Sequence, residues 1–197
     1  MNAGRGPGEI ARTTLALLAL CAASPVRSEP LVKIAIRYYE VTGHSAGELR
    51  AQLDRLGPIG SDGRRYDGRT DWDARWSYSY SDSAAGCRID RVTVSANITY
   101  TMPSWNGADS APQPLREHWR GYLAALRRHE EGHRDLALEA ARAIERGIRE
   151  MPQTLLCQAL PAALDALGQR TVEQHKKLDA EYDARTGHGT TQGAVFP

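Results

Sequence analysis

Residues 115–151 read LREHWRGYLAALRRHEEGHRDLALEAARAIERGIREM, and they carry the longest helical periodicity in the chain. Apolar residues recur there every three or four positions, which places them on one face of an α-helix. Pro152 follows directly and is expected to end the helix, because proline has no amide hydrogen to donate. We therefore expect one long helix, and we expect the rest of the fold to pack against its stripe of Leu115, Trp119, Tyr122, Leu126, His129, His133, Leu136, Ala140 and Ile144.

A second helix is expected from about Pro161 to Tyr182, with its leucines facing inward. If it packs antiparallel to the first helix, the chain retraces the distance that it has just covered. The 21 residues from His129 to residue 150 span about 32 Å at about 1.5 Å per residue. The segment after Tyr182 is therefore expected to return to the level of the two histidines.

Three stretches before the long helix show the alternation of apolar and polar residues that is typical of strands. They are LVKIAIRYYEVTG at 31–43, TDWDARWSYSYSD at 70–82 and CRIDRVTVSANITYTMP at 87–103. The second and third are separated by a short turn and are expected to form an antiparallel hairpin. Between the first two, Ser45 and Glu48 form a capping box that predicts a helix ending at Gly57. Trp72, Trp76 and Tyr78 share one face, where we expect them to pack under the helices or to line a substrate cleft.

These elements predict an α+β fold, in which a small antiparallel sheet packs against the long helix and an antiparallel second C-terminal helix. Residues 1–28 resemble a secretory signal peptide, with a basic start and an apolar run at 13–23 that is too short to cross a bilayer. Residues 29–197 are expected to form a single exported domain. We expect a secreted or periplasmic bacterial protein without a stable membrane span after cleavage.

Charge and cysteine usage narrow the function further. The chain has 25 basic and 24 acidic residues, and removal of residues 1–28 takes away three basic residues and one acidic residue. A near-neutral chain without a basic patch gives no support for nucleic-acid binding. The mature chain keeps Cys87 and Cys157, which we expect to form a disulfide bond in an exported protein.

The motif HEEGH at residues 129–133 indicates a metal site within the long helix. His129 and His133 lie one turn apart on the same face, so both imidazoles can reach one ion. Glu130 is rotated by about 100° from His129, where it can deprotonate a zinc-bound water without binding the metal. Glu131 is unusual, because zinc-protease helices keep the middle positions of this motif uncharged. A helix with hydrogen-bonded core histidines and no metal is the alternative interpretation.

Catalytic zinc takes three protein ligands and a water, so a third ligand is needed. The segment that returns to the histidine pair contains Asp183 and His188, and the glycines that flank His188 permit close backbone approach. His188 is our first choice, followed by Asp183 and then by His175 on the second helix. Tyr182 is a candidate for stabilising an oxyanion, although a core tyrosine is the simpler interpretation.

The chain resembles the predicted secreted zinc-dependent proteases, a bacterial family long carried as a domain of unknown function. The resemblance covers most of the mature chain and rests on YYEVTG, LRAQLDRLGP, GRTDWDARWSYSY, LREHWRGYLAALRRHEEGH and EYDARTGHGTTQGAVFP. It implies that YDARTGHG belongs to the same module as HEEGH. The former segment also loosely resembles the aspartate-bearing ligand segment of aspzincins (GTxDxxYG), with a different residue order. The choice between Asp183 and His188 therefore stays open.

We expect an exported zinc metalloprotease that acts on a peptide or protein substrate, with Glu130 as general base. The alternatives are a non-catalytic periplasmic binding or assembly module with a structural or vestigial zinc site, and a zinc amidase that acts on the cell wall. The motif indicates a water-activating metal but does not identify the bond that is cut.

Overall fold

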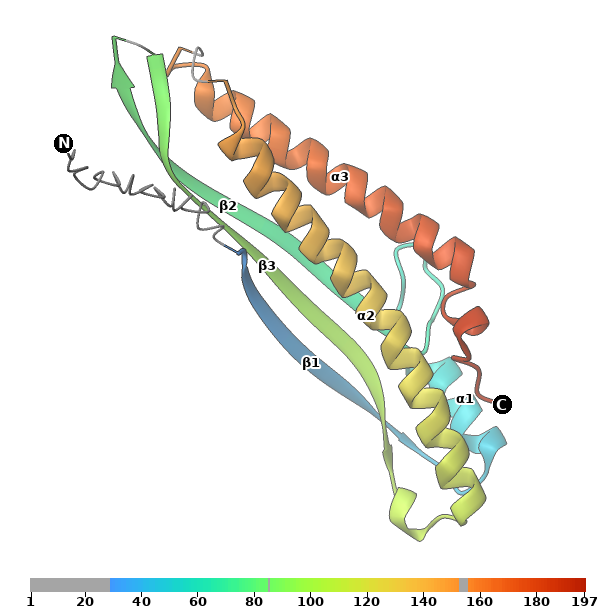
Figure 1. The fold of residues 1–197 in the computed structure, drawn as a ribbon. Helices are drawn as coiled ribbons and strands as arrows, with labels where there is room; N and C mark the ends of the chain where they lie inside the picture. Colours follow the sequence, from blue (N-terminus) through green and yellow to red (C-terminus); the bar gives the residue numbers. More distant parts are fainter. Residues whose placement is uncertain (1–28, 85, 153–155) are drawn as a thin grey trace, which may run out of the picture.

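The computed structural model describes residues 29–84, 86–152 and 156–197, so the expected signal peptide at 1–28 lies outside the described residues. Two long helices, α2 (Gln113–Arg149) and α3 (Leu160–Thr186), lie side by side against a sheet of three long strands (Figure 1). The strands are β1 (Leu31–Thr42), β2 (Arg69–Ser83) and β3 (Gly86–Asn106), and a short helix α1 (Ala46–Leu56) follows β1. The expected α+β class is confirmed.

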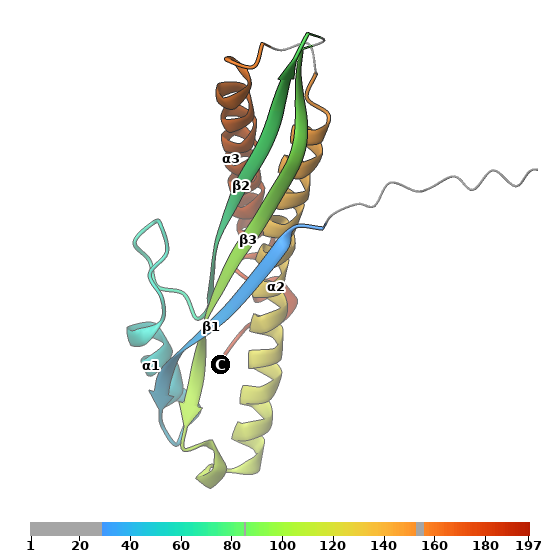
Figure 2. The same cartoon turned by 90° about the vertical axis from the view of Figure 1, so that its left-hand side faces the viewer.

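The sheet has the order β1-β3-β2, with β3 in the centre. The predicted hairpin is confirmed, because β2 and β3 pair antiparallel. The expectation of an all-antiparallel sheet is wrong for the remaining pair, since β1 runs parallel to β3. The chain leaves β1 through α1 and a loop and re-enters the sheet as β2 on the far side of β3, so β1 and β2 never meet as neighbours (Figure 2).

The core lies between the central strand and α2. Alternate residues of β3 point toward the helix and are buried: Val92, Val94, Ala96, Ile98, Tyr100 and Met102. The face of α2 that packs against these residues has small side chains at Ala137, Ala140 and Ala141, followed by Ile144 and Ile148. All five are fully buried. Small residues let the helix approach the sheet closely, and each fully buried large aliphatic side chain contributes about 1.5–3 kcal/mol. This packing holds the middle of α2, where the histidines lie, against a rigid sheet.

Helix α3 packs over β2 through a close contact at Gly168. A Cβ atom at this position would collide with the Trp76 ring, and the Trp76 Nε1 donates a hydrogen bond to Asp165 at 3.1 Å. Trp72 is buried as well, with 7% of its surface exposed. The structure thus places these tryptophans in packing contacts under α3, and neither lines the cleft described below.

The apolar face of β1 is exposed, which differs from the half-buried strand that its alternation predicts. Val32, Ile34, Ile36 and Tyr38 are 40–62% exposed. They lie on the same sheet face as the buried residues of β3, because Ile34 is in register with Ile98 and Ile36 with Tyr100. The apolar face of the sheet extends at β1 past the area that α2 covers. The alternating pattern of β1 therefore belongs to an edge strand and not to the buried centre of the sheet.

A disulfide bond joins Cys87 near the start of β3 to Cys157 in the connection between α2 and α3, with a Cα–Cα distance of 5.0 Å. The predicted pairing is confirmed, and it ties the tip of the β2–β3 hairpin to the helices. Within the described ranges, no helix combines the length and the apolar character that crossing a bilayer requires.

Candidate metal centre

Two buried histidines from α2 form the first part of the site. His129 and His133 are 2% and 5% exposed, because both lie on the apolar stripe that faces the sheet and α3. One helical turn separates them, and their Nε2 atoms are 3.2 Å apart. Their rings are nearly perpendicular, with an interplanar angle of 85°. The two Nε2 atoms therefore converge on one point beside the helix.

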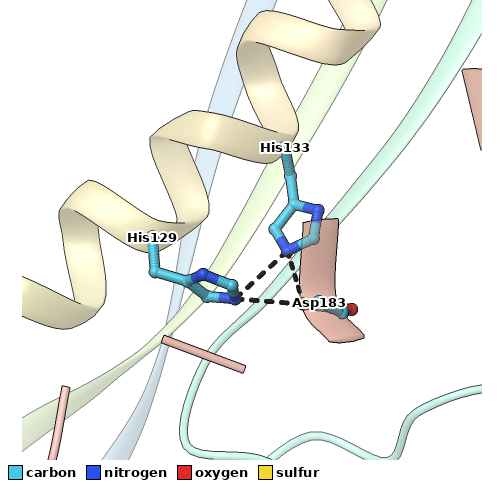
Figure 3. A group of neighbouring side chains, drawn as sticks. All are labelled: His129, His133 and Asp183. Atoms are coloured by element: carbon cyan, nitrogen blue, oxygen red, sulfur yellow. Dashed lines mark hydrogen bonds and ion pairs between the residues drawn. The ribbon is translucent and has the colours of Figure 1, made fainter. Parts of the chain in front are cut away.

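Asp183 supplies a third donor atom from the last turn of α3. Its Oδ1 lies 3.1 Å from the Nε2 of His129 and 3.1 Å from the Nε2 of His133 (Figure 3). The three donor atoms all lie within 4.8 Å of one another. Within the described part of the chain, this group has no fourth histidine, cysteine or carboxylate. The three side chains could hold a metal ion and would leave coordination positions for other molecules.

The other ring nitrogen of each histidine has its own partner. The Nδ1 of His129 lies 3.0 Å from the Gln192 Oε1, and the Nδ1 of His133 lies 2.9 Å from the Asp179 Oδ1. Each oxygen is an acceptor, so each Nδ1 carries a hydrogen and each ring presents its Nε2 to Asp183. Once both Nε2 atoms are deprotonated, three lone-pair donors face one another, and a cation between them would relieve their repulsion. The donor set therefore fits a metal ion.

The charges of the site lead to the same conclusion. Burial lowers the pKa of His133, but hydrogen bonds to Asp179 and Asp183 outweigh this effect and raise it to about 10. Burial raises the pKa of Asp183, but hydrogen bonds from His129 and His133 outweigh it and place this pKa below its ordinary value. The carboxylates around the two rings thus favour a positive charge at this position. A bound metal ion would take the place of the proton, as is usual for histidine ligands.

Glu130 lies next to the group without being part of it. Its side chain is buried, with 3% of the residue exposed, and its Oε2 accepts a 2.7 Å hydrogen bond from the Thr70 hydroxyl at the start of β2. Burial raises the pKa of Glu130, since a charged carboxylate is costly away from water. The loop before β2 approaches it closely at Gly68, where a Cβ atom would lie 2.6 Å from the Glu130 Oε1. A carboxylate with a raised pKa is suited to accepting and returning a proton.

The centre opens into a cleft of about 820 Å³ between α2, α3 and the loop before β2. Glu130 and all three members of the group line it. The loop is held in place by Asp67, which forms an ion pair with Arg50 of α1 and accepts a 2.9 Å hydrogen bond from the Tyr122 hydroxyl of α2. Arg50 also donates to the Phe196 carbonyl at 3.1 Å, so α1, the loop and the C-terminal segment are tied together.

The structure brings Asp183, rather than our first choice His188, to the two histidines. Helix α3 continues four residues beyond the expected end at Tyr182, so Asp183 lies on a helix face that is directed at α2. His188 follows in a left-handed turn with a φ of 51°. It lies outside the group of three, although its Nδ1 is 3.4 Å from the Asp183 Oδ1 and its ring is 4.4 Å from the Tyr66 ring. His188 therefore lines the cleft beside the third member.

Neither His175 nor Tyr182 belongs to the group of three donor residues. The His175 Nδ1 donates to the Thr171 carbonyl at 2.8 Å, and His175 is two turns of α3 before Asp183. The Tyr182 ring stacks on the His129 ring at 5.1 Å, and its hydroxyl donates to the His129 carbonyl at 3.2 Å. Tyr182 does not line the cleft, so its contacts support the position of His129 rather than a role at an oxyanion.

Glu131, the unusual residue of the motif, faces away from the site. Its carboxylate lies 3.5 Å from Arg127 and 3.9 Å from Arg134, both on the same helix. The charge at this position is therefore paired on the outer side of α2, away from the three candidate donor atoms. The departure from the usual motif has no consequence for the ligand geometry.

Three residues of the site were missed by sequence reasoning: Asp179, Gln192 and Thr70. A sequence pattern could have predicted Asp179, because it precedes Asp183 by four residues and therefore shares its helix face. No pattern could have predicted Gln192 or Thr70, since a single glutamine in a tail and a single threonine at a strand start are common. Each is brought to the site by tertiary packing alone.

Together, the fold and the site define an α+β protein with a potential His-His-Asp metal centre at the base of a cleft. Residues 36–189 match the model of the family described as bacterial protein of unknown function (DUF922), and the chain belongs to this family. No curated protein and no solved structure matches the chain. The match spans both histidines and Asp183, and the conclusions about chemistry rest on the geometry described above.

Proposed function

We propose that the protein is an exported zinc-dependent hydrolase that cleaves peptide bonds. The observation that carries the proposal is the convergence of the two Nε2 atoms and the Asp183 Oδ1 at the base of a cleft, with the buried carboxylate of Glu130 beside them. Two imidazole nitrogens and one carboxylate oxygen form a donor set that is typical of catalytic zinc, which keeps a further position open.

In this proposal His129, His133 and Asp183 hold the ion, which when bound supplies a Lewis acid that activates water at neutral pH. Glu130 takes the proton from the attacking water and delivers it to the leaving amine. Thr70 holds the Glu130 carboxylate by its hydrogen bond. The hydrogen bonds at each Nδ1 keep the two imidazoles in the orientation that binding requires.

The test separates metal binding from chemistry. Zinc content and cleavage of casein and peptides are measured for the mature wild-type protein, His129→Ala, Glu130→Gln and Glu131→Gln. We expect His129→Ala to lose zinc and activity, and Glu130→Gln to keep zinc while losing at least about 10²-fold in kcat. Glu131→Gln is the matched control, because the neighbouring glutamate is paired on the outer side of α2; it should keep both properties.

Two further variants decide which residue is the third ligand. Asp183→Ala should lose zinc, whereas His188→Ala should retain it, because only Asp183 belongs to the group of three. A wild-type protein that binds no zinc would refute the metal assignment. A zinc-loaded protein that cleaves no peptide bond would refute the hydrolase and leave a metal-binding module.

A further inference from the structure

The cationic side chains of the cleft differ in how their charge is compensated. Three of the five are ion-paired with carboxylates of the same loop region, namely Arg50 with Asp67, Arg64 with Asp62, and Arg69 with Asp71. Arg65 and Lys176 have no carboxylate of the described residues within 4 Å, and the exposed Arg65 donates to the Gly57 carbonyl at 2.7 Å. Lys176 is the one of these two that comes from α3, the helix that carries Asp183.

Lys176 is held in a defined position although it forms no direct ion pair with a carboxylate of the described residues. Its Nζ donates to the Trp72 carbonyl at 3.2 Å and lies 3.7 Å from the centroid of the Trp72 ring. An ammonium group has three donors, and no second acceptor is bonded to it within the described part of the chain. Asp179, Asp71 and Asp73 act on Lys176 only over a longer distance, and each has a closer partner, namely His133, Arg69 and Arg75. An anion can therefore bind Lys176 without displacing another charged group.

The place of Lys176 relative to the metal centre follows from helix geometry. Lys176 precedes Asp183 by seven residues, which is two turns along the same face of α3 and about 10.5 Å. Lys176 is the first residue of α3, and Asp71 the last residue of β2, that lines the cleft. Beyond them α3 closes on β2 through the contact of Gly168 with Trp76. Lys176 therefore lies at the end of the cleft next to this contact, and it remains exposed to solvent.

We propose that this end of the cleft binds a carboxylate of the peptide substrate and that Lys176 forms an ion pair with it. This proposal rests on the proposed function, since it takes the ligand of the cleft to be a peptide. An extended chain advances about 3.3 Å per residue, so about 10.5 Å corresponds to about three residues from the bond at the metal centre. The carboxylate belongs either to a glutamate or aspartate side chain or to the C-terminus of the substrate.

The test compares peptides that differ only in this charge. A series carries glutamate or glutamine at each position within four residues of the cleaved bond, and each peptide is made with a free and with an amidated C-terminus. We expect the wild type to prefer one carboxylate about tenfold in kcat/KM, mainly through KM, as a charge-assisted hydrogen bond permits. A preference for glutamate assigns the side chain, and a preference for the free C-terminus assigns the terminal carboxylate.

Two variants connect the preference to one side chain. Lys176→Gln should abolish the preference, and Lys176→Glu should reverse it toward a lysine-bearing peptide. Lys177→Gln is the matched control, because Lys177 is exposed, lies 3.4 Å from Glu173 and does not line the cleft. It should keep the wild-type preference. Equal kcat/KM for charged and neutral peptides in the wild type would overturn the proposal.

A binding measurement keeps this result separate from the proposed chemistry. The zinc-loaded Glu130→Gln protein is titrated with fluorescent versions of the same peptides, and their anisotropy is followed. Tenfold tighter binding of the carboxylate-bearing peptide, lost in Lys176→Gln, supports the proposal even if no peptide is cleaved. Binding without this difference, or no binding of any peptide, refutes the carboxylate site, whereas the hydrolase itself is judged only by cleavage.

Discussion

The clearest single perturbation of the proposed metal centre is Asp179→Asn. Asp179 does not belong to the group of three, but its Oδ1 accepts a 2.9 Å hydrogen bond from the Nδ1 of His133. Asparagine keeps the shape and the acceptor oxygen and removes only the negative charge. The substitution therefore isolates the electrostatic support that a carboxylate gives to a metal-binding imidazole.

The expected effect follows from this contact. Loss of such a supporting carboxylate lowers metal affinity by about 10–100-fold, or about 1.4–2.8 kcal/mol. We expect a value within this range, because the Nδ1 of His133 keeps an acceptor while Asp183 remains in place. Asp183→Ala removes a donor atom and should weaken zinc binding by more than Asp179→Asn does.

Competition with a chromophoric zinc chelator gives the dissociation constant of each variant. Glu181→Gln is the control for a lost negative charge on α3, since Glu181 is exposed and lies outside the cleft lining. Its dissociation constant should equal that of the wild type within about twofold. If Asp179→Asn bound zinc as tightly as the wild type, or if Glu181→Gln weakened it equally, the role assigned to Asp179 would be refuted.

Three further outcomes are expected. Gly68→Ala places a Cβ atom 2.6 Å from the Glu130 Oε1, so peptide cleavage should fall about tenfold or more while zinc content stays at the wild-type level; unchanged cleavage would contradict this. Replacing both Cys87 and Cys157 by alanine releases a loop of 70 residues and should lower the free energy of unfolding by about 4 kcal/mol in guanidinium chloride, with zinc binding retained. Ile144→Ala empties a fully buried position and should cost about 2–5 kcal/mol in the same assay; a loss below about 1 kcal/mol would contradict the packing of α2 on the sheet.

Local pattern accounts for the elements that were predicted correctly. The long helix and the β2–β3 hairpin follow from apolar periodicity, and periods of 3.6 and 2 residues are properties of neighbouring positions. The side of α2 on which His129 and His133 lie follows from the same periodicity. The cysteine pairing follows from the expected export and the even cysteine count. Each of these inferences needs only residues that are close in sequence, or a count.

Long-range placement accounts for the errors. The parallel pairing of β1 with β3 depends on which side of β3 the chain re-enters the sheet, and the alternation within β1 is the same in either case. The choice of third ligand depended on where α3 ends, and a difference of four residues exchanged His188 for Asp183. Helix ends are set by local turns and packing together, so counting along the chain locates them only to within a few residues.

The sequence by itself therefore determined the long helix, the inward pair of histidines with Glu130 between them, and the disulfide bond, because each depends on periodicity or composition. Only the tertiary structure decided that Asp183 completes the group, that Gln192 and Asp179 hydrogen-bond to the imidazoles, and that Lys176 lines the cleft without a direct ion pair. The contacts of His133 with Asp179 and of His129 with Gln192 join positions that are 46 and 63 residues apart. These hydrogen bonds form because the packing of α3 on α2 and β2 brings the side chains within hydrogen-bonding distance. That packing cannot be predicted from patterns of neighbouring residues.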